Sequence, residues 1–394
     1  MLVSTQDDPK GQVAPVFSGN WVSAILPFAP DQAILARFGG GLAGLFGRDV
    51  PPANATDDPQ SALPAPEPAT FGADQLRALT QSLDKRAPLA VGSGAFYALD
   101  RQTRGDWPLR YGSAGVELFG MNAPEARQGM DAFEENTSTG PHRAGQEEDC
   151  FVFTSEPRSL NPNAPQVPSQ NTRTRSEIND GTWQDAKYPL SFDGPDLWIS
   201  FSVPAGLFRV ALYWFNNTER DGLNRLRDHR VLLYGGDISP QECLTREPLA
   251  KARLWSGWNG EYAAFAVRGP GSHRIRIARD RWHGTVLECL FFDRLGQFPT
   301  RPDWLPATDS MPVVPSIAPD APYQDAAALW QACDRVESRG VPAPLERLVA
   351  LRAAKTLGAP TALLHAWRIQ AGVWDESSDR QDVALPSIAP AKTE

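Results

Sequence analysis

The chain has 394 residues and a formal net charge of −9, and it contains 36 prolines and 32 glycines. So much proline argues against a mostly helical protein, because proline in a helix interior costs about 3 kcal/mol, while the 41% hydrophobic fraction and 12 tryptophans exclude wholesale disorder. A chain this acidic does not resemble a nonspecific nucleic-acid binder, which needs a basic face for counterion release. No apolar run reaches the roughly 18 residues of a membrane span.

The charge is unevenly distributed along the chain. Residues 204–296 carry 14 Arg and Lys against 10 Asp and Glu, so the remainder has a net charge of −13. A solvated surface is the ordinary explanation, and a site for a polyanion or an anionic glycan is the alternative.

The cysteines are scattered singly and show none of the CxxC spacing of a zinc site. Cys289 lies in an apolar run and is expected to be buried as a small hydrophobic residue. One or two disulfides would fit the number of cysteines, and their spacing assigns no pairing. The four positions are Cys150, Cys243, Cys289 and Cys333.

Residues 1–70 are predicted to be an extended arm followed by a proline-rich linker. Two apolar patches, 13–25 and 33–46, make the arm a candidate for docking on a partner. The first ten residues lack the basic and apolar regions of a secretory signal. We therefore expect either a cytoplasmic protein or a mature or partial piece of a longer chain, and we favour the second.

A helix is predicted over 71–83, where leucines recur at helical spacing. The apolar, aromatic-rich runs 95–99 and 116–119 are bounded by glycine and predict β-strands. Residues 122–180 have little apolar periodicity, so we expect a long loop there, broken only by a strand at 150–154.

The strongest strand signals lie between residues 183 and 295. Glycine and proline separate the apolar runs, and no helical pattern intervenes, which indicates an antiparallel sandwich. With the upstream strands this makes eight or nine, the number of a jelly roll. We therefore predict a mainly β protein with a jelly-roll-like antiparallel β-sandwich over 71–296. The expected strands here are 197–203, 208–215, 231–234, 261–267, 273–278 and 286–293.

A second proline-rich linker is expected at 297–322. Three helices follow, each starting near a proline and ending near a glycine. They predict a small C-terminal helical hairpin or cap over 323–375, ahead of a disordered tail at 376–394. The expected helices are 323–337, 344–357 and 360–371.

Several motifs together carry a resemblance to a known group of proteins. They are PAGLFRVALYWFN from Pro204, NRLRD from Asn224, PLAKARLW from Pro248, GWNGEY from Gly257, RGPG from Arg268 and FFDRL from Phe291. They resemble a β-sandwich module of large bacterial exported and surface proteins, in which PxGxYxxxLYxxN, NRxRD, VxGPGxYxxxIxR and FxDRL recur. Thr103–Tyr111 is similar to a phrase that often precedes this module. The resemblance covers about 95–295 and implies a galactose-binding-like jelly roll, with no assigned activity to carry over.

Carbohydrate sites use aromatic faces against the apolar side of a sugar, with polar side chains at its hydroxyls. Rings in and around the glycine-rich loop 256–260 are candidates for this role, and so is the polar stretch 216–228. The candidate ligand-binding residues are Trp255, Trp258, Tyr262, Asn216, Asn224, Arg225 and Asp228.

Each candidate also has a purely structural alternative. The rings could pack under the sandwich, and an Arg225–Asp228 ion pair could hold 216–228 as a hairpin loop. Asp193 and Asp196 are weak calcium candidates near the sandwich edge. No other cofactor or metal is expected.

Catalysis has little support in the sequence. Glycoside hydrolysis needs two carboxylates that face each other across the sugar. Glu261 and Asp293 are the best pair, yet nothing in their surroundings singles them out. We therefore predict that the protein is not an enzyme.

We predict a non-catalytic binding module of a secreted or cell-surface protein, with carbohydrate as its ligand and an extracellular, periplasmic or cell-surface location. The alternative is a structural or assembly subunit of a larger extracellular or envelope complex, docking through its N-terminal arm and C-terminal helices. A glycoside-active enzyme is the third hypothesis. The expected partners are a glycan or other protein subunits, in an oligomer or complex, without nucleic acid and without a membrane span.

Overall fold

The computed structural model describes residues 71–371 apart from short gaps, together with two short strands nearer the N-terminus. These strands, β1 (Phe17–Ser18) and β2 (Trp21–Val22), pair antiparallel with each other. The described residues from 71 onwards belong to one compact unit, and β1 and β2 belong to another. The gaps are 102, 147–152, 156–157, 160, 175, 181–193, 216–227, 256–259, 282–283 and 308.

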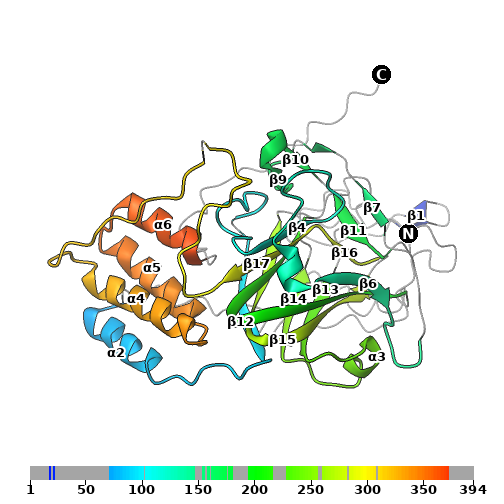
Figure 1. Cartoon of the computed structure of the whole chain (residues 1–394), viewed down its shortest axis with the longest axis horizontal. Coiled ribbons are helices and arrows are strands. Elements are labelled where there is room, and N and C mark those ends of the chain that lie inside the picture. Colours follow the sequence, from blue (N-terminus) through cyan, green and yellow to red (C-terminus); the bar gives the residue numbers. More distant parts are fainter. Residues whose placement is uncertain are drawn as a thin grey trace. The chain divides into compact units, whose positions relative to one another are not determined.

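A nine-stranded antiparallel sheet is built around two long strands, β12 (Asp196–Trp214) and β15 (Glu261–Arg281). They pair along their whole length, from Leu197 opposite Ile277 to Trp214 opposite Glu261 (Figure 1). The expected strands 197–203 and 208–215 are therefore one strand, and so are 261–267 and 273–278. The remaining strands of this sheet are β3 (Gly94–Asp100), β4 (Gly115–Leu118), β5 (Arg127–Gln128), β6 (Asn136–Gly140), β13 (Asp228–Gly235), β14 (Ala250–Trp255) and β17 (Cys289–Arg294).

A β-bulge divides the long pair into two halves. Val203 pairs with Gly271 and Gly206 with Gly269, so two residues of β12 face one residue of β15. This extra residue reverses which side chains of β12 face inward. Before the bulge, Leu197, Ile199, Phe201 and Val203 lie in the core, and after it Phe208, Val210, Leu212 and Trp214 do.

The two halves form the two layers of a sandwich, which confirms the predicted fold class. The first layer joins the half before the bulge to β6, β13 and β14. The second layer joins the half after the bulge to β3, β17, β4 and β5. Apolar side chains of both layers form one buried cluster between them, including Val231, Leu233, Phe265, Ile275, Leu290 and Phe292.

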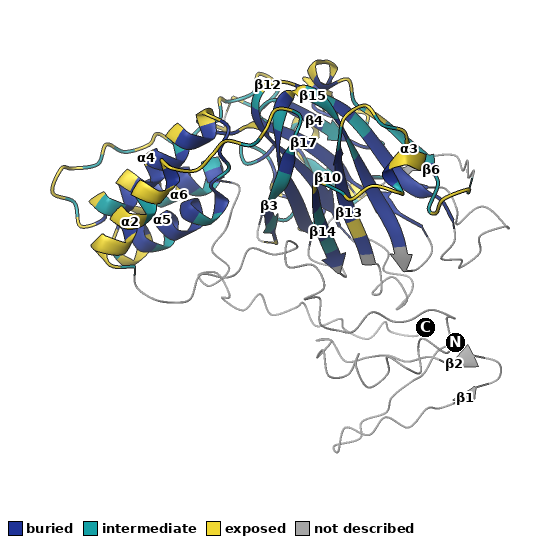
Figure 2. Cartoon of the chain, turned by 90° about the horizontal axis from the view of Figure 1, so that it is seen from below, coloured by how far each residue is buried: buried dark blue, intermediate teal, exposed yellow. Residues whose placement is uncertain are grey.

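A helical layer covers the outer face of the second layer. The three predicted C-terminal helices are confirmed within one residue at each end, as α4 (Gln324–Ser338), α5 (Pro344–Thr356) and α6 (Thr361–Ala371). They share a core with the outer side chains of the second layer, among them Leu207, Tyr213 and Phe291. In Figure 2 the helices are buried toward one another and toward the sheet and exposed on their other faces.

The first predicted helix belongs to this helical layer. It is α2 (Ala73–Leu83), it packs against α4, and its Leu76 and Leu83 are buried in the same core as the C-terminal helices. The sequence placed this helix in the sandwich domain. Its leucines pack against α4, which lies far away in the sequence. No local pattern identifies that neighbour, so only the folded chain shows it.

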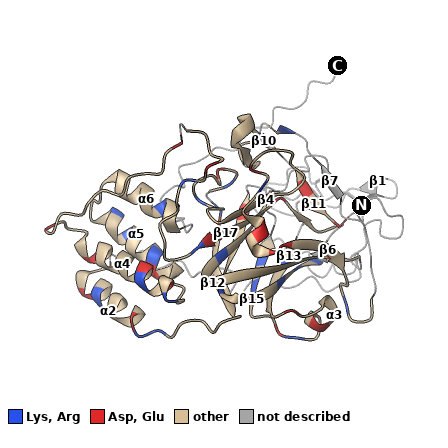
Figure 3. Ribbon diagram, viewed as in Figure 1, with Lys and Arg blue, Asp and Glu red and all other residues tan. Residues whose placement is uncertain are grey.

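Buried charges join α4, α5 and the second layer. Tyr97 on β3 donates to Glu337 on α4 over 3.1 Å, and Glu337 also accepts from Arg347 on α5 over 2.6 Å. Figure 3 shows acidic and basic residues side by side where α4 and α5 meet. The helices are therefore held by specific polar contacts as well as by apolar packing.

Residues 122–180, expected as a loop, contain several short strands. Besides β5 and β6 these are β7 (Phe153–Ser155), β8 (Arg158–Ser159), β9 (Gln166–Val167), β10 (Thr172–Thr174) and β11 (Glu177–Asn179). β16 (Val286–Leu287) pairs with β11. The strand expected at 150–154 overlaps β7, and residues 150–152 lie outside the described residues. β16 lies within the strand expected at 286–293. The prediction missed β5, β6 and β8 to β11, because strands of two to five mostly polar residues show no apolar alternation. β14 was missed as well, although its Ala252 and Leu254 face the core.

Candidate functional site

Both ends of the β12–β15 pair come to the same end of the sandwich, which we call the loop end. Trp214, at one end of the pair, donates its indole N–H to the carbonyl of Val286 over 2.6 Å. The preceding residue, Thr285, donates to Asp180, which also binds Arg279 near the other end of the pair. β11 and β16 thus close this end between the two layers.

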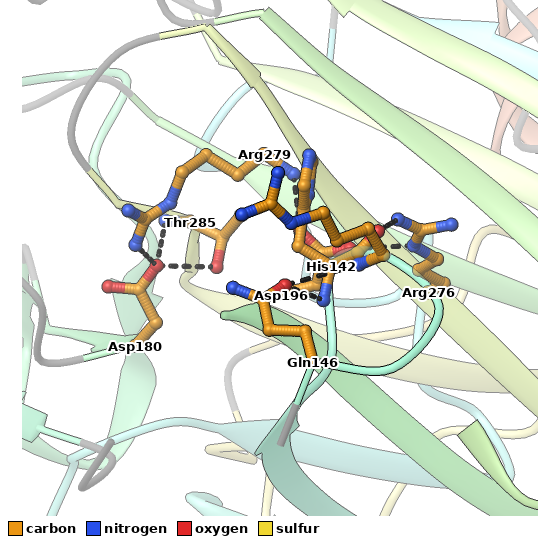
Figure 4. A network of polar contacts seen from close by, with 8 residues as sticks. His142, Gln146, Asp180, Asp196, Arg276, Arg279 and Thr285 are labelled. Atoms are coloured by element: carbon orange, nitrogen blue, oxygen red, sulfur yellow. Dashed lines mark hydrogen bonds and ion pairs between the residues drawn. The ribbon is translucent and has the colours of Figure 1, made fainter. Parts of the chain in front are cut away.

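Asp196, the first residue of β12, gathers three nitrogen donors at the loop end (Figure 4). One carboxylate oxygen lies 2.8 Å from His142 Nδ1 and accepts the backbone N–H of Arg279 over 2.8 Å. The other oxygen accepts from Arg276 Nε over 2.6 Å. The carboxylate is fully buried, so this charge is paired with the Arg276 guanidinium instead of being solvated.

Asp180 forms the second half of the same network. One of its oxygens accepts from Arg279 Nη2, from the backbone N–H of Thr285 over 2.8 Å and from the Thr285 hydroxyl over 3.1 Å. Arg279 and Asp180 are both fully buried. Gly194 lies against the guanidinium, and a Cβ there would come within 2.1 Å of Arg279 Nη1, so only glycine allows this close approach.

The network ties together segments that are far apart in the sequence. It joins the turn after β6, the residue after β11, the start of β12, the last part of β15 and the residue before β16. The hydrogen bonds of this network therefore fix the positions where these segments enter and leave the loop end. Sequence reasoning missed His142, Asp180, Arg276 and Arg279, and the only local signal was the alternation of arginine and isoleucine in Arg274–Ile277.

Two of the predicted ligand-binding residues are neighbours in the sheet. Asp228 begins β13 and pairs with Trp255 at the end of β14. Asp228 also pairs with Arg281 at the end of β15. Asn216, Asn224, Arg225 and Trp258 lie outside the described residues.

Tyr262 is a core residue. Its ring stacks on Tyr111 with 4.2 Å between centroids, and its hydroxyl donates to the carbonyl of Arg104. It has no exposed surface, so no ligand reaches it from solvent in this structure. Ala264 and Ala266 lie on the same side of β15 as Tyr262. Small side chains at these positions indicate that another part of the chain packs closely over this face.

The two catalytic candidates are engaged in separate ion pairs. Glu261 binds Arg101 over 2.7 Å, and Asp293 binds Arg209 over 2.8 Å. Glu261 pairs with Trp214 of β12, and Asp293 pairs with Arg209 of the same strand. Trp214 and Arg209 are five residues apart, so the two acidic residues are separated by about 17 Å along the strand direction. They also lie on opposite faces of the second layer, because Trp214 faces the core and Arg209 does not. They cannot flank one glycosidic bond.

A carboxylate with a strongly shifted pKa lies at the edge of the second layer. Burial raises the pKa of Glu117 to about 7, against the opposing effect of Arg127. Arg127 also binds Glu135 over 3.0 Å. Arg127, on the edge strand β5, therefore binds both Glu117 and Glu135. Ion pairing at this edge of the sheet explains the cluster.

Within the described residues, no group of three or more His, Cys, Asp and Glu side chains is placed to hold a metal ion. Of the calcium candidates, Asp193 lies outside the described residues, and the oxygens of Asp196 already face nitrogen donors, whereas calcium takes oxygen ligands. Cys243, Cys289 and Cys333 are free and buried, as expected for Cys289. None of the described helices combines the length and the apolar character needed to cross a bilayer.

Comparison with known proteins gives distant structural similarity only. No family model and no curated protein matches the sequence. The chain is similar to the CBM32-1 and CBM32-2 domains of Clostridium perfringens ZmpB, with a TM-score of 0.24, 11% identity and 58% of this chain covered. A second structure of those domains, in complex with GalNAc, matches with a TM-score of 0.24, 10% identity and 58% coverage. The matches span 52% and 51% of those chains, about half of each.

Proposed function

We propose that the chain is a non-catalytic binding module of a secreted or cell-surface protein, and that it binds carbohydrate at the loop end. The observation that carries this proposal is the register that brings Asp228 opposite both Trp255 and Arg281. An aromatic, an acidic and a basic residue are therefore neighbours in the backbone register of the sheet. These are the residue types that contact sugar rings and hydroxyls.

The buried network supports the proposal. A ligand binds more tightly when the residues of its site are held in place before it arrives, because less ordering is needed on binding. Asp180, Asp196 and Arg279 tie five segments together beneath the loop end. Arg279 lies two residues before Arg281 on β15, so this network supports the proposal that a binding site forms at the loop end.

The test is glycan-array binding by the full chain and by Trp255→Ala and Trp258→Ala. We expect wild-type binding to a defined set of glycans and at least a tenfold loss in each variant, with circular dichroism unchanged. Leu249→Ala is the matched control, because Leu249 is an exposed apolar residue beside Leu233, toward the other end of β13. No glycan binding by the wild type, or full binding by both tryptophan variants, would overturn the proposal.

One of the two docking elements of the assembly-subunit hypothesis packs within its own chain. Its docking elements were to be the N-terminal arm and the C-terminal helices. The apolar faces of α4, α5 and α6 pack on α2 and on the second layer of the same chain. The arm, apart from β1 and β2, lies outside the described residues. Native mass measurement of the full chain and of a chain lacking residues 1–70 tests what remains: a stable oligomer that dissociates on deletion would favour assembly.

A further inference from the structure

The connection between β13 and β14 reaches across the outer face of the first layer. It runs from Gly236 to Leu249 and contains the short helix α3 (Pro240–Cys243), and we call it the α3 segment. Gln241 on α3 donates to the carbonyl of Gln146, in the turn after β6, over 2.9 Å. Because β15 and β12 lie between β13 and β6 in the sheet, the α3 segment extends over these two strands.

The α3 segment covers a small cluster that is separate from the core between the two layers. The cluster combines two aromatic residues with a leucine of the sheet and a cysteine of α3. Half-buried apolar residues of the segment pack against them. An indole and a phenol ring therefore lie beneath the segment. The buried members of the cluster are Trp198, Leu232, Tyr234 and Cys243.

The α3 segment is bound to the sheet at its two ends. Gly236 and Leu249 donate their backbone N–H groups to carbonyls of the sheet over 2.8 and 2.7 Å. Between these ends, the hydrogen bonds found among the described residues are local to the segment, apart from that of Gln241. Cys243 is buried, whereas the other residues of the segment are exposed or half-buried (Figure 2). A segment with so few buried side chains opens more readily than the core does.

Two buried nitrogen donors on this face lack an acceptor. Within the described residues, neither Trp198 Nε1 nor Arg274 Nε has a hydrogen-bond partner. Arg274 lies opposite Tyr234 of β13 and Ser200 of β12, and two residues from the partner of Trp198, so these side chains share one face. A buried donor without an acceptor is unfavourable, and native proteins keep few of them. Oxygen atoms of a ligand would satisfy both donors.

The Trp198 ring is held in place without the α3 segment. Arg276 lies 5.5 Å from the centroid of this ring, and Asp196 binds Arg276 over 2.6 Å. On its other side, the indole lies against Gly140 of β6, where a Cβ would come within 3.0 Å of Nε1. Both contacts belong to the sheet, so the ring keeps its position when the segment moves away.

We infer that the α3 segment is a lid over a second carbohydrate site, which is formed by Trp198, Tyr234 and Arg274. When the lid opens, a sugar replaces Cys243 and its neighbours against the aromatic rings. The hydroxyl oxygens of the sugar accept from Trp198 Nε1 and Arg274 Nε. This site lies apart from the loop end, and it rests on the proposed function only in taking the same class of ligand. A sugar that binds the open form alone shifts the chain toward that form.

Opening of the lid is measured at Cys243, which is free and buried beneath it. Burial raises the pKa of this thiol to about 11, so the closed form reacts slowly with iodoacetamide at pH 8. We expect mass spectrometry to show alkylation of Cys243 at least tenfold faster than that of Cys289 and Cys333, which lie in the core shared with the helical layer. Equal rates at all three cysteines would overturn the lid.

The variant that weakens the lid is Gln241→Ala, which removes the hydrogen bond to the carbonyl of Gln146. It should raise the alkylation rate of Cys243 at least threefold. The matched control is Gln81→Ala, at an exposed glutamine of α2, which should leave the rate within 1.5-fold of wild type. An unchanged rate in Gln241→Ala would contradict the lid.

Sugar binding beneath the lid is tested with four probes: hexasaccharides of glucose, galactose, mannose and xylose. We expect at least one of them to raise the alkylation rate of Cys243 at least threefold, with a saturable dependence on its concentration. Trp198→Phe keeps an aromatic ring and removes the indole donor, so it should raise the half-saturating concentration at least fivefold. Trp304→Phe, at a half-buried tryptophan packed against the other core, is the matched control and should stay within twofold. Alkylation that every probe leaves unchanged or slows would overturn the site.

The loop-end variants separate this inference from the proposed function. Glycan binding that is lost in Trp255→Ala and Trp258→Ala, with no effect of any sugar on Cys243, would overturn the inference and leave the proposed function intact. A sugar effect on Cys243 that persists in both variants, together with full glycan binding by them, would overturn the loop-end site and support the site beneath the lid. No effect of any sugar by either measurement would defeat both.

Discussion

Arg279 is fully buried and reaches Asp180 across the end of the sandwich. Removing one partner of a buried pair leaves an uncompensated charge and costs about 3–5 kcal/mol. We expect the Arg279→Met variant to have a free energy of unfolding, measured in urea, that is lower by about that amount. Adding Asp180→Asn to the same chain should restore more than half of the lost stability. Arg77→Met removes the ion pairs of an exposed arginine with Asp74 and Asp325 and should cost less than about 1 kcal/mol. Equal small losses in both single variants would contradict this account.

His273 should make the stability of the fold depend on pH. It stacks on Phe201 at 5.6 Å inside the sandwich, and burial lowers its pKa below 6.5. Below pH 6.5 the unfolded chain binds a proton that the folded chain does not, so stability falls with falling pH. Between pH 7.5 and 5.5 wild type should lose up to about 1.4 kcal/mol more than His273→Leu. Parallel stability–pH curves would show that His273 does not contribute.

At the scale of elements, the bulge in β12 decides which side chains enter the core. Deleting Ala205 would remove the extra residue opposite Pro270, and the half of β12 after it would turn Leu207 and Arg209 inward. Because Arg209 is bound to Asp293 on the outer side, we expect an insoluble or unfolded protein. Deleting Val314, an exposed residue of the segment before α4, should be tolerated. Soluble, cooperatively folding protein lacking Ala205 would show that the register adapts.

At the scale of the whole molecule, the helical layer and the sandwich should unfold together. Tyr97, Glu337 and Arg347 form a buried chain of contacts between them, and the helices share a core with the second layer. Helical circular dichroism and tryptophan fluorescence should therefore report one thermal midpoint. A chain truncated before α4 should aggregate, because it exposes the apolar outer face of the second layer. Two separated transitions would indicate independent domains.

Part of this architecture could be predicted from the sequence because the information is local. The three C-terminal helices begin at or shortly after prolines and carry apolar faces, and their bounds were predicted almost to the residue. The apolar runs of β12 and β15 likewise indicated a sandwich. Asp228 and Trp255 could be named as candidates from their residue types, although nothing local showed that they pair.

The sequence by itself determined the composition of the core strands, the helices and the turn-forming glycines, because each depends on neighbours a few residues away. Only the tertiary structure decided that β12 crosses from one layer to the other, that Tyr262 is covered, and that Arg279 meets Asp180. These features depend on pairings between residues tens to hundreds of positions apart. Register and burial follow from the packing of the whole sheet, which no local pattern encodes.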